Sequence, residues 1–327
     1  MSAMRELGLP SLGHVFYRKQ ALAAGWSAGE IRRKLDRGEW VRARHGAYAE
    51  ASCWDRLDEH GRHLLMARAA MGAVGGRSVL CGPTAAVLHG LPDHDLDLSA
   101  VHLWRSDERH GRLAAGVRHH QGEMSPDDMC VKDGLRVTSV ARTAVDVART
   151  SSLATGLVVT DAALRRASPM EVREVLDRQR SWSGAAAAAR VVQMADGRSE
   201  SVGESLGRLV VVRGGLPVPE LQVDIRDPAA RLVGRVDFLF EEQRTIGEFD
   251  GRDKYGRSSS SDPRAADPRL DPGRSDDPGE RVWREKLRED ALRDLGFEVV
   301  RFVWAELWTP AVIIERFERA FRRAACR

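Results

Sequence analysis

Two apolar segments joined by four polar residues constrain the fold of this chain most strongly. Residues 231–240 read RLVGRVDFLF, residues 245–250 read TIGEFD, and EEQR lies between them. Two strand-like segments separated by a four-residue loop are typical of an antiparallel hairpin. Such a loop pairs Phe240 with Thr245, and this pair sets the register of the hairpin. We therefore expect Asp237 to lie directly opposite Glu248.

Three carboxylates occur inside this hairpin, although acidic residues are depleted in strands. Asp237 and Glu248 would have Cβ atoms about 5 Å apart across the pair. Asp250 lies two residues after Glu248 and shares its face. The alternate positions of the first strand are apolar and are expected to be buried: Val236, Phe238 and Phe240. The hairpin thus predicts three acids gathered at one rim of a sheet.

Opposed like charges destabilise a strand pair, so a positive charge is expected between these acids. Carboxylate oxygens bind hard cations, which makes Mg²⁺ or Mn²⁺ the expected metal, with Ca²⁺ also possible by this chemistry. Glu204, on a helix predicted over 201–213, is a further candidate ligand. The alternative is that Lys254 or Arg252 folds back over the acids, in which case the acidic rim is structural.

Residues 1–60 are predicted to form a winged helix-turn-helix. One short helix ends at Gly25, and a second begins after Ser27, where Glu30 completes a capping box, and ends at Gly38. The segment EWVRARHGAYAE then alternates as a hairpin. The candidate DNA contacts are the cations of the second helix and the hairpin: Arg32, Arg33, Lys34, Arg37, Arg42 and Arg44. A solvated basic helix on a protein-binding module is the alternative.

The rest of the chain predicts an α/β (α+β) fold class with two further regions. Residues 61–198 read as strands followed by helices, with Asp133 and Gly134 at a tight hairpin turn. Residues 199–327 read as four strands flanked by helices over 201–213, 281–295 and 309–324. A Ser-, Asp- and Pro-rich insertion at 257–280 has almost no apolar residue and is expected to be disordered.

Composition excludes several classes of protein. Four cysteines without a CxxC pair favour buried thiols over a zinc knuckle or a disulfide framework. The net charge of +3 means that basic surfaces must be local. No apolar run approaches the roughly 20 residues of a membrane span, and no signal peptide is evident. A cytoplasmic protein with no membrane partner is expected. His119 and His120 are adjacent in a predicted strand, point to opposite faces and are interpreted as structural.

The C-terminal segments GRVDFLF, IGEFDGRDKYG and EKLREDALRDLGFEVVRFVWAEL resemble the PD-(D/E)XK, or restriction-endonuclease-like, fold and its very-short-patch-repair-endonuclease-like branch. The resemblance implies that Asp237 and Glu248 are metal ligands of a phosphodiester-cleaving site. The chain departs from the motif at Asp250, where the family usually has lysine. Lys254 or Lys286 would have to replace that lysine; Lys286 lies on an amphipathic helix and is more simply a solvated residue.

The front of the chain, with YRKQALAAGWSAGEIRRKLDRGEWVRARHGAYA and DGLRVTSVARTAVDVAR, is similar to AbiEi-type antitoxins of type IV toxin–antitoxin systems. Two functions follow from the two resemblances. The strand-paired acids favour a metal-dependent DNA endonuclease guided by the winged helix, with Asp250 on metal or water and Lys254 near the phosphate. The alternative is an AbiEi-like antitoxin or transcriptional repressor, with a possible cognate toxin as partner and an inert nuclease-like domain.

Overall fold

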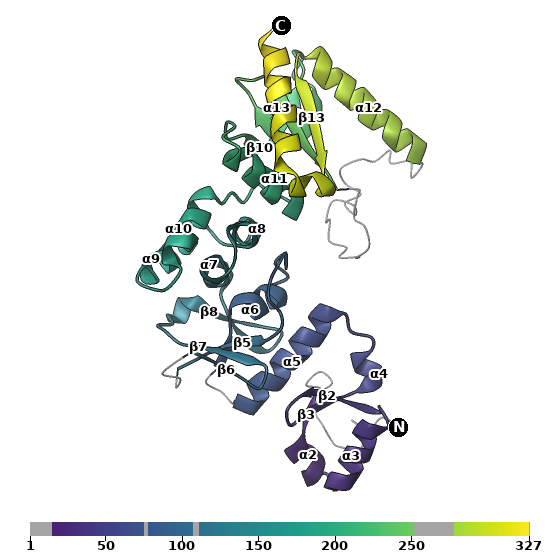
Figure 1. Cartoon of the computed structure of the whole chain (residues 1–327), viewed down its shortest axis with the longest axis vertical. Coiled ribbons are helices and arrows are strands. Elements are labelled where there is room, and N and C mark those ends of the chain that lie inside the picture. The colour runs from purple at the N-terminus through teal and green to yellow at the C-terminus, as the bar shows by residue number, and fades with distance from the viewer. Residues whose placement is uncertain (1–14, 75–77, 107–110, 252–277, 327) are drawn as a thin grey trace. The chain divides into compact units, whose positions relative to one another are not determined.

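The computed structural model describes residues 15–74, 78–106, 111–251 and 278–326 (Figure 1). The chain divides into two compact units, Met1–Ala195 and Asp196–Arg327, which are described separately below. Both units combine helices with sheets, which confirms the expected α/β fold class. None of the helices within the described residues is long and apolar enough to cross a membrane.

The first unit begins with a helix-turn-helix followed by a hairpin. Its elements are β1 (Phe16–Tyr17), α2 (Arg18–Ala23), α3 (Ala28–Asp36), β2 (Trp40–Arg44) and β3 (Ala47–Glu50), and the strands form a sheet in the order β1-β3-β2. Ser27 caps α3: its Oγ accepts a hydrogen bond from Glu30 N at 3.2 Å, and the Glu30 carboxylate accepts one from Ser27 N at 2.8 Å. The winged arrangement and the capping box are as expected from the sequence.

Aromatic packing holds this small module together. Phe16 and Trp40 are fully buried and meet edge to face, with ring centroids 4.5 Å apart. Trp26 lies 5.0 Å from the same Trp40 ring, and Ile31 inserts from α3 into the same cluster. Buried aromatic rings contribute large apolar areas, so α3 is anchored by its inner face and presents its outer face to solvent.

A six-stranded sheet follows, in the order β6-β7-β5-β4-β9-β8. Helices α4 (Ala51–Trp54) and α5 (Glu59–Val74) lead into it, and α6 (Gly82–His89) follows its first strand. The strands are β4 (Ser78–Leu80), β5 (Val101–Arg105), β6 (Arg112–Ala114), β7 (Val117–His120), β8 (Met129–Lys132) and β9 (Leu135–Thr138). Asp133 and Gly134 join β8 to β9 with φ of +50° and +73°, the tight turn that their sequence predicts.

Four helices complete the first unit: α7 (Val140–Thr150), α8 (Leu153–Ala163), α9 (Pro169–Arg178) and α10 (Ala185–Met194). A buried ion network joins them to the sheet. Arg142 of α7 donates through Nε to both oxygens of Asp146, at 3.1 Å each, and through Nη1 to Asp128 at 2.8 Å. The Trp182 ring lies 5.0 Å from the guanidinium groups of both Arg142 and Arg149. This network fixes the start of α7 against the turn that precedes β8.

The second unit is a four-stranded sheet in the order β10-β11-β12-β13, with α12 as the crossover to the last, parallel strand. Its elements are α11 (Val202–Arg213), β10 (Glu220–Arg226), β11 (Leu232–Phe240), β12 (Thr245–Asp250), α12 (Pro278–Asp294), β13 (Glu298–Val303), the 3-10 turn η3 (Trp304–Trp308) and α13 (Pro310–Ala325). Phe240 pairs with Thr245, Leu239 with Ile246 and Phe238 with Gly247, so the register expected from the four-residue loop is confirmed.

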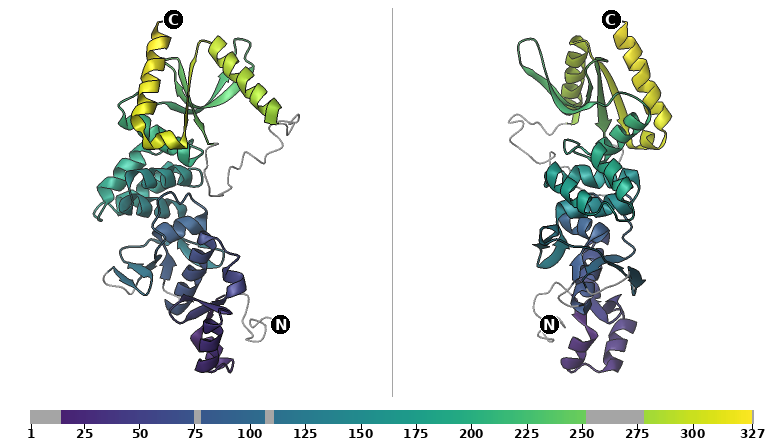
Figure 2. Two further views of the ribbon diagram at one scale, coloured as in Figure 1. Left: turned by 45° about the vertical axis from the view of Figure 1, so that its right-hand side comes forward. Right: turned by 90° about the vertical axis from the view of Figure 1, so that its left-hand side faces the viewer.

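Helices cover both faces of this second sheet (Figure 2). The adjacent residues Ile246 and Gly247 point to opposite faces of β12. Leu292 of α12 packs in the cluster that contains Ile246, whereas Phe317 of α13 lies against Gly247. Val236, Phe238 and Phe240 are buried, as their alternation predicts.

Two expectations from the sequence need correction here. Cys53 and Cys81 are buried, but Cys130 and Cys326 are exposed, so burial of all four thiols is wrong. The predicted insertion at 257–280 lies outside the described residues up to position 277, and positions 278–280 already belong to α12. Pro278 can begin a helix because the first turn leaves its backbone N–H groups unpaired in any case.

Candidate functional site

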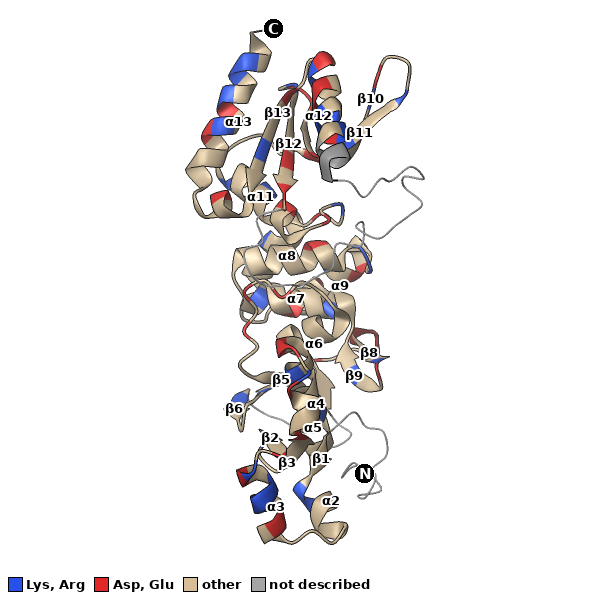
Figure 3. Ribbon diagram, turned by 90° about the vertical axis from the view of Figure 1, so that its right-hand side faces the viewer, with Lys and Arg blue, Asp and Glu red and all other residues tan. Residues whose placement is uncertain are grey.

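The basic residues predicted to contact DNA gather on α3 (Figure 3). Arg32 and Arg33 are exposed on α3, and Arg37 is exposed at its C-cap. Arg32 lies 3.8 Å from Asp36, and Lys34 pairs with Glu39. Exposed ion pairs of this kind contribute about 0–1 kcal/mol, so these cations can exchange their carboxylate partners for phosphate at little cost. The outer face of α3 is thus a cationic surface of a type that suits nucleic acid.

The hairpin departs from its predicted alternation at Ala43. Arg42 pairs with Tyr48 and Arg44 pairs with Ala47, a register shift that marks a β-bulge between them. A bulge re-aims the side chain that follows it. Arg42 is exposed, whereas Arg44 is half-buried and its Nη1 lies 3.4 Å from the carbonyl oxygen of Ala69 in α5. Arg42 and Arg44, both predicted DNA contacts, therefore differ in exposure.

In the second unit, Asp237 of β11 and Glu204 of α11 are joined by a residue that the sequence did not single out, Gln222. Asp237 Oδ2 accepts a hydrogen bond from Phe249 N at 2.9 Å. Its Oδ1 accepts one at 3.0 Å from Gln222 Nε2, which also donates to Glu204 Oε2 at 2.9 Å. Glu204 also accepts from Glu200 N at 2.9 Å. One amide group thus bridges the carboxylates of Asp237 and Glu204.

Gln222 holds this position with an unusual backbone conformation. Its φ is +56°, in the left-handed region that non-glycine residues seldom adopt, and its side chain is buried. Leu221 pairs with Phe238 and Val223 with Val236, so Gln222 lies across from Asp237. Strain of this kind costs about 1–3 kcal/mol and concentrates where a side chain must be aimed at a particular place.

Asp237 is the acid whose ionisation is most perturbed. Burial raises the pKa of its carboxyl group to about 7, and the nearby charges of Glu204 and Glu248 act in the same direction. The hydrogen bonds from Phe249 and Gln222 oppose the shift. Asp237 is therefore close to half protonated at neutral pH.

Arginines from two other elements face Glu248. Arg288 of α12 donates through Nη2 to Glu248 Oε1 at 2.6 Å, and Arg301 Nε of β13 lies 3.2 Å from Oε2. Both guanidinium groups also contact Glu285, and Arg301 lies 3.0 Å from Glu289. The positive charge expected beside the acids is thus supplied by arginines that the sequence did not single out. The two residues proposed for that role, Arg252 and Lys254, lie outside the described residues.

The remaining predicted residues are peripheral to these contacts. Asp250 ends β12 and is half-buried, and Lys286 is exposed on α12, as expected of a solvated position. Within the described parts of the chain, no group of three or more His, Cys, Asp or Glu side chains could hold a metal ion. Glu248 already faces two guanidinium groups and Asp237 accepts two N–H donors, so a metal ion would have to displace these partners. Metal binding by Asp237, Glu248, Asp250 and Glu204 stays a prediction.

Comparison with known proteins bears on the first unit. The family described as AbiEi antitoxin C-terminal domain matches residues 78–196, a range that contains the six-stranded sheet and helices α7 to α10. The match ends where the second unit begins, so it does not include the acidic residues of β11 and β12.

Two relatives and one solved structure are similar to the chain. "Uncharacterized protein MT2308" and "Uncharacterized protein Rv2248", from two strains of Mycobacterium tuberculosis, are each 30% identical over 263 residues, which cover 77% of this chain and 84% of theirs. The crystal structure of RV2827C protein from the same species aligns with a TM-score of 0.41 and 16% identity, over 58% of this chain and 75% of that one.

Proposed function

Because the chain belongs to the family of the mycobacterial proteins MT2308 and Rv2248 and carries an AbiEi antitoxin C-terminal domain, we propose that it is a DNA-binding regulator of the AbiEi antitoxin class. The observation that carries the proposal is the arrangement of the first unit. A helix-turn-helix and hairpin with a cationic outer face lie N-terminal to the AbiEi domain, with α4 and α5 between them, and all belong to one compact unit. The DNA of its own promoter is the proposed target.

The geometry suggests how each part would contact DNA. Helix α3 enters the major groove while its inner face stays anchored on Trp40 and Phe16. Arg33 and Arg37 neutralise phosphates or reach base edges, and Arg42 contacts the backbone beside the groove from the hairpin. Each phosphate neutralised releases counterions, so the affinity should fall steeply with salt concentration.

The class also implies a second partner. AbiEi antitoxins act within toxin–antitoxin systems, so a cognate toxin is the proposed protein partner of this chain. Co-expression with the product of a neighbouring toxin-like gene tests this: relief of growth arrest supports the partnership, and unchanged arrest contradicts it.

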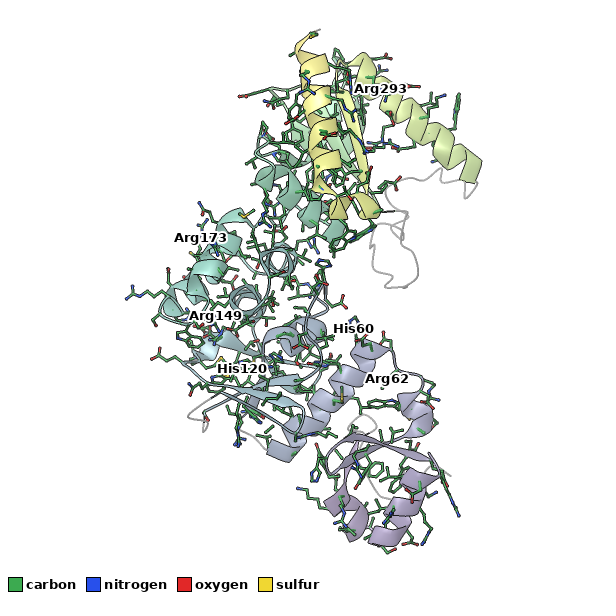
Figure 4. The ribbon with its side chains drawn as sticks, in the orientation of Figure 1. His60, Arg62, His120, Arg149, Arg173 and Arg293 are labelled. Atoms are coloured by element: carbon green, nitrogen blue, oxygen red, sulfur yellow. The ribbon has the colours of Figure 1, made fainter. Side chains whose placement is uncertain are left out.

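DNA binding is tested by fluorescence anisotropy with a labelled fragment of the chain's own promoter at several salt concentrations. We expect the double variant Arg33→Ala/Arg37→Ala to bind at least tenfold more weakly and with a shallower salt dependence. Arg173, exposed on α9 and labelled in Figure 4, provides the matched control because Arg173→Ala removes a cation away from α3. Equal affinities of the wild type and the double variant would contradict the proposal.

A second candidate, metal-dependent DNA cleavage by the second unit, is favoured by one observation: Asp237 and Glu204 share the amide of Gln222, and the charge of Glu248 acts on the same Asp237 carboxyl group. Incubating supercoiled plasmid with the protein and Mg²⁺ or Mn²⁺, beside Asp237→Ala/Glu248→Ala and an EDTA control, tests it. Nicking that needs both the metal and the two acids would support cleavage. Promoter binding without nicking would contradict DNA cleavage and support the regulator function only.

A further inference from the structure

A cavity of about 300 Å³ opens inside the first unit, between the hairpin of the winged module and the six-stranded sheet. The end of β2 and the hairpin turn contribute Arg44 and His45, and α5 contributes Met66. Val101 of β5 and Val117 of β7 form the opposite wall, and Ser99 lies at the approach to β5. The volume is at the lower end of the roughly 300–1,000 Å³ that small-molecule sites have, and apolar walls with few polar groups are typical of such sites.

The charged group of the cavity is Arg44, which the bulge at Ala43 turns inward. Its Nε is buried without a hydrogen-bond partner, and its Nη1 reaches only the Ala69 carbonyl, at 3.4 Å. Among the carboxylates that the structure describes, none pairs with Arg44. Arg44 is half-buried, and this burial lowers the pKa of its guanidinium. A partly desolvated cation without a counter-ion is unfavourable, so an anion that enters the cavity would stabilise it.

We propose that this cavity binds a small organic carboxylate, with its anionic head on Arg44 and its apolar body against Met66, Val101 and Val117. A guanidinium group recognises a carboxylate through paired, charge-assisted hydrogen bonds. Ser99 and His45 can add polar contacts at the rim. The apolar walls favour a carboxylic acid with a hydrocarbon body over inorganic phosphate, which would leave those walls facing water.

A ligand bound in the cavity would restrict the position of the hairpin β2–β3. Arg44 and Arg42 belong to the same strand, on either side of the bulge, so a ligand held between Arg44 and the six-stranded sheet fixes the wing relative to that sheet. The consequence for DNA affinity rests on the proposed function, whereas ligand binding itself does not. The two are separated by measuring ligand binding without DNA and promoter binding without ligand.

The test is calorimetric titration of the full-length protein with benzoate, phenylacetate and hexanoate, each beside its amide. We expect saturable binding of at least one acid and at least tenfold weaker binding of the matching amide, because the amide keeps the shape and loses the charge. Arg44→Gln should abolish this binding. Arg118→Gln, which removes an exposed cation from β7 next to Val117, should retain it.

Ser99→Phe is the second variant, because Ser99 is exposed and a phenyl ring there obstructs the cavity without removing Arg44. It should weaken carboxylate binding at least tenfold while leaving the circular dichroism spectrum unchanged, and it keeps the test decisive should Arg44→Gln fail to fold. No binding by any of the three acids, equal binding of acid and amide, or wild-type binding by folded Arg44→Gln or Ser99→Phe would overturn the proposal.

Discussion

At the scale of single residues, Gln222 shows how one amide can organise an acidic cluster. It donates to carboxylates on both sides, from α11 and from β11, and it does so in a backbone conformation that its residue type disfavours. Asp237 and Glu204 would otherwise meet without a donor between them. The raised pKa of Asp237 comes first from burial of its carboxyl group and then from the nearby charge of Glu204.

Removing that amide should weaken the second unit. Gln222→Ala removes hydrogen bonds to two carboxylates while the strained backbone keeps a Cβ, so we expect a loss of about 2–3 kcal/mol in the free energy of unfolding. Urea unfolding of the full-length protein measures this loss of stability. Gln243→Ala, in the loop between β11 and β12, is the matched control and should change stability by less than about 0.5 kcal/mol.

The pKa of Asp237 predicts an unusual pH dependence. The folded protein keeps the proton up to about pH 7, whereas the unfolded chain releases it near pH 4, so the folded state binds more protons between these values. The stability of the second unit should therefore fall as pH rises from about 4.5 to 7.5, by up to about 4 kcal/mol. Asp237→Asn should flatten this slope in urea unfolding curves. An equal slope of stability against pH in Asp237→Asn would show that other groups cause the pH dependence.

At the scale of elements, α12 is held on the sheet by charge as well as by Leu292. Arg288 links Glu285 of its own helix to Glu248 of β12, and these three groups lie in a partly buried setting. Among the described residues, loss of Arg288 would leave Arg301 of β13 as the cation that Glu248 and Glu285 share, so the partly buried acids would lose half of their compensation. The docking of α12 thus depends on the same carboxylate that the sequence assigned to metal binding.

The substitution Arg288→Ala should therefore loosen α12 more than a substitution of its exposed neighbour Lys286 does. We expect hydrogen exchange in residues 283–294 to accelerate at least tenfold, because Glu248 and Glu285 lose a shared cation. Lys286→Ala, which removes an exposed charge from the same helix, should leave the exchange rates within about twofold. Similar protection in both variants would show that apolar packing alone holds the helix.

Local sequence patterns predict the helices and strands better than they predict which side chains come into contact. The four-residue loop after Phe240 fixes the register of β11 and β12, and Ser27 with Glu30 fixes the start of α3, because both depend on neighbours in the chain. Arg288 and Arg301 reach Glu248 from elements 40 and more residues away. Nothing in the local sequence gives the crossover geometry that brings them there.

Backbone irregularities account for the other discrepancies. The bulge at Ala43 turns Arg44 inward, and the positive φ of Gln222 aims its amide at Asp237. Both positions carry ordinary residues, without the glycine that usually marks such places in a sequence. Strict alternation therefore predicts the wrong face for Arg44 and gives no reason to single out Gln222.

At the scale of the whole molecule, the two units should respond to acid in opposite directions. In the first unit, burial lowers the pKa values of His63, His89, His102 and His120; that of His102 falls to about 3, with the neighbouring His120 adding to the effect. A histidine with a lowered pKa stays neutral when folded and gains a proton on unfolding. The stability of the first unit should therefore be lost as pH falls below about 6.5.

Calorimetry between pH 7.5 and 5 should resolve this difference. We expect the transition of the first unit to move to lower temperature on acidification, while that of the second unit moves to higher temperature as Asp237 becomes protonated. His102→Gln should reduce the shift of the first unit, and Asp237→Asn should reduce that of the second. If both transitions move in the same direction, the lowered histidine pKa values do not control the first unit, or the raised pKa of Asp237 does not control the second.

The buried network around Arg142 limits how this lineage can vary. Arg142 serves Asp146 and Asp128 at once, and Trp182 covers the Arg142 guanidinium. Loss of either acid leaves the buried Arg142 with a single carboxylate, and loss of the arginine leaves Asp128 with Arg178 and Asp146 with Arg149. Each single step therefore unbalances the network before a compensating step can follow. Descendants of this chain should either keep the trio intact or replace it together with apolar side chains.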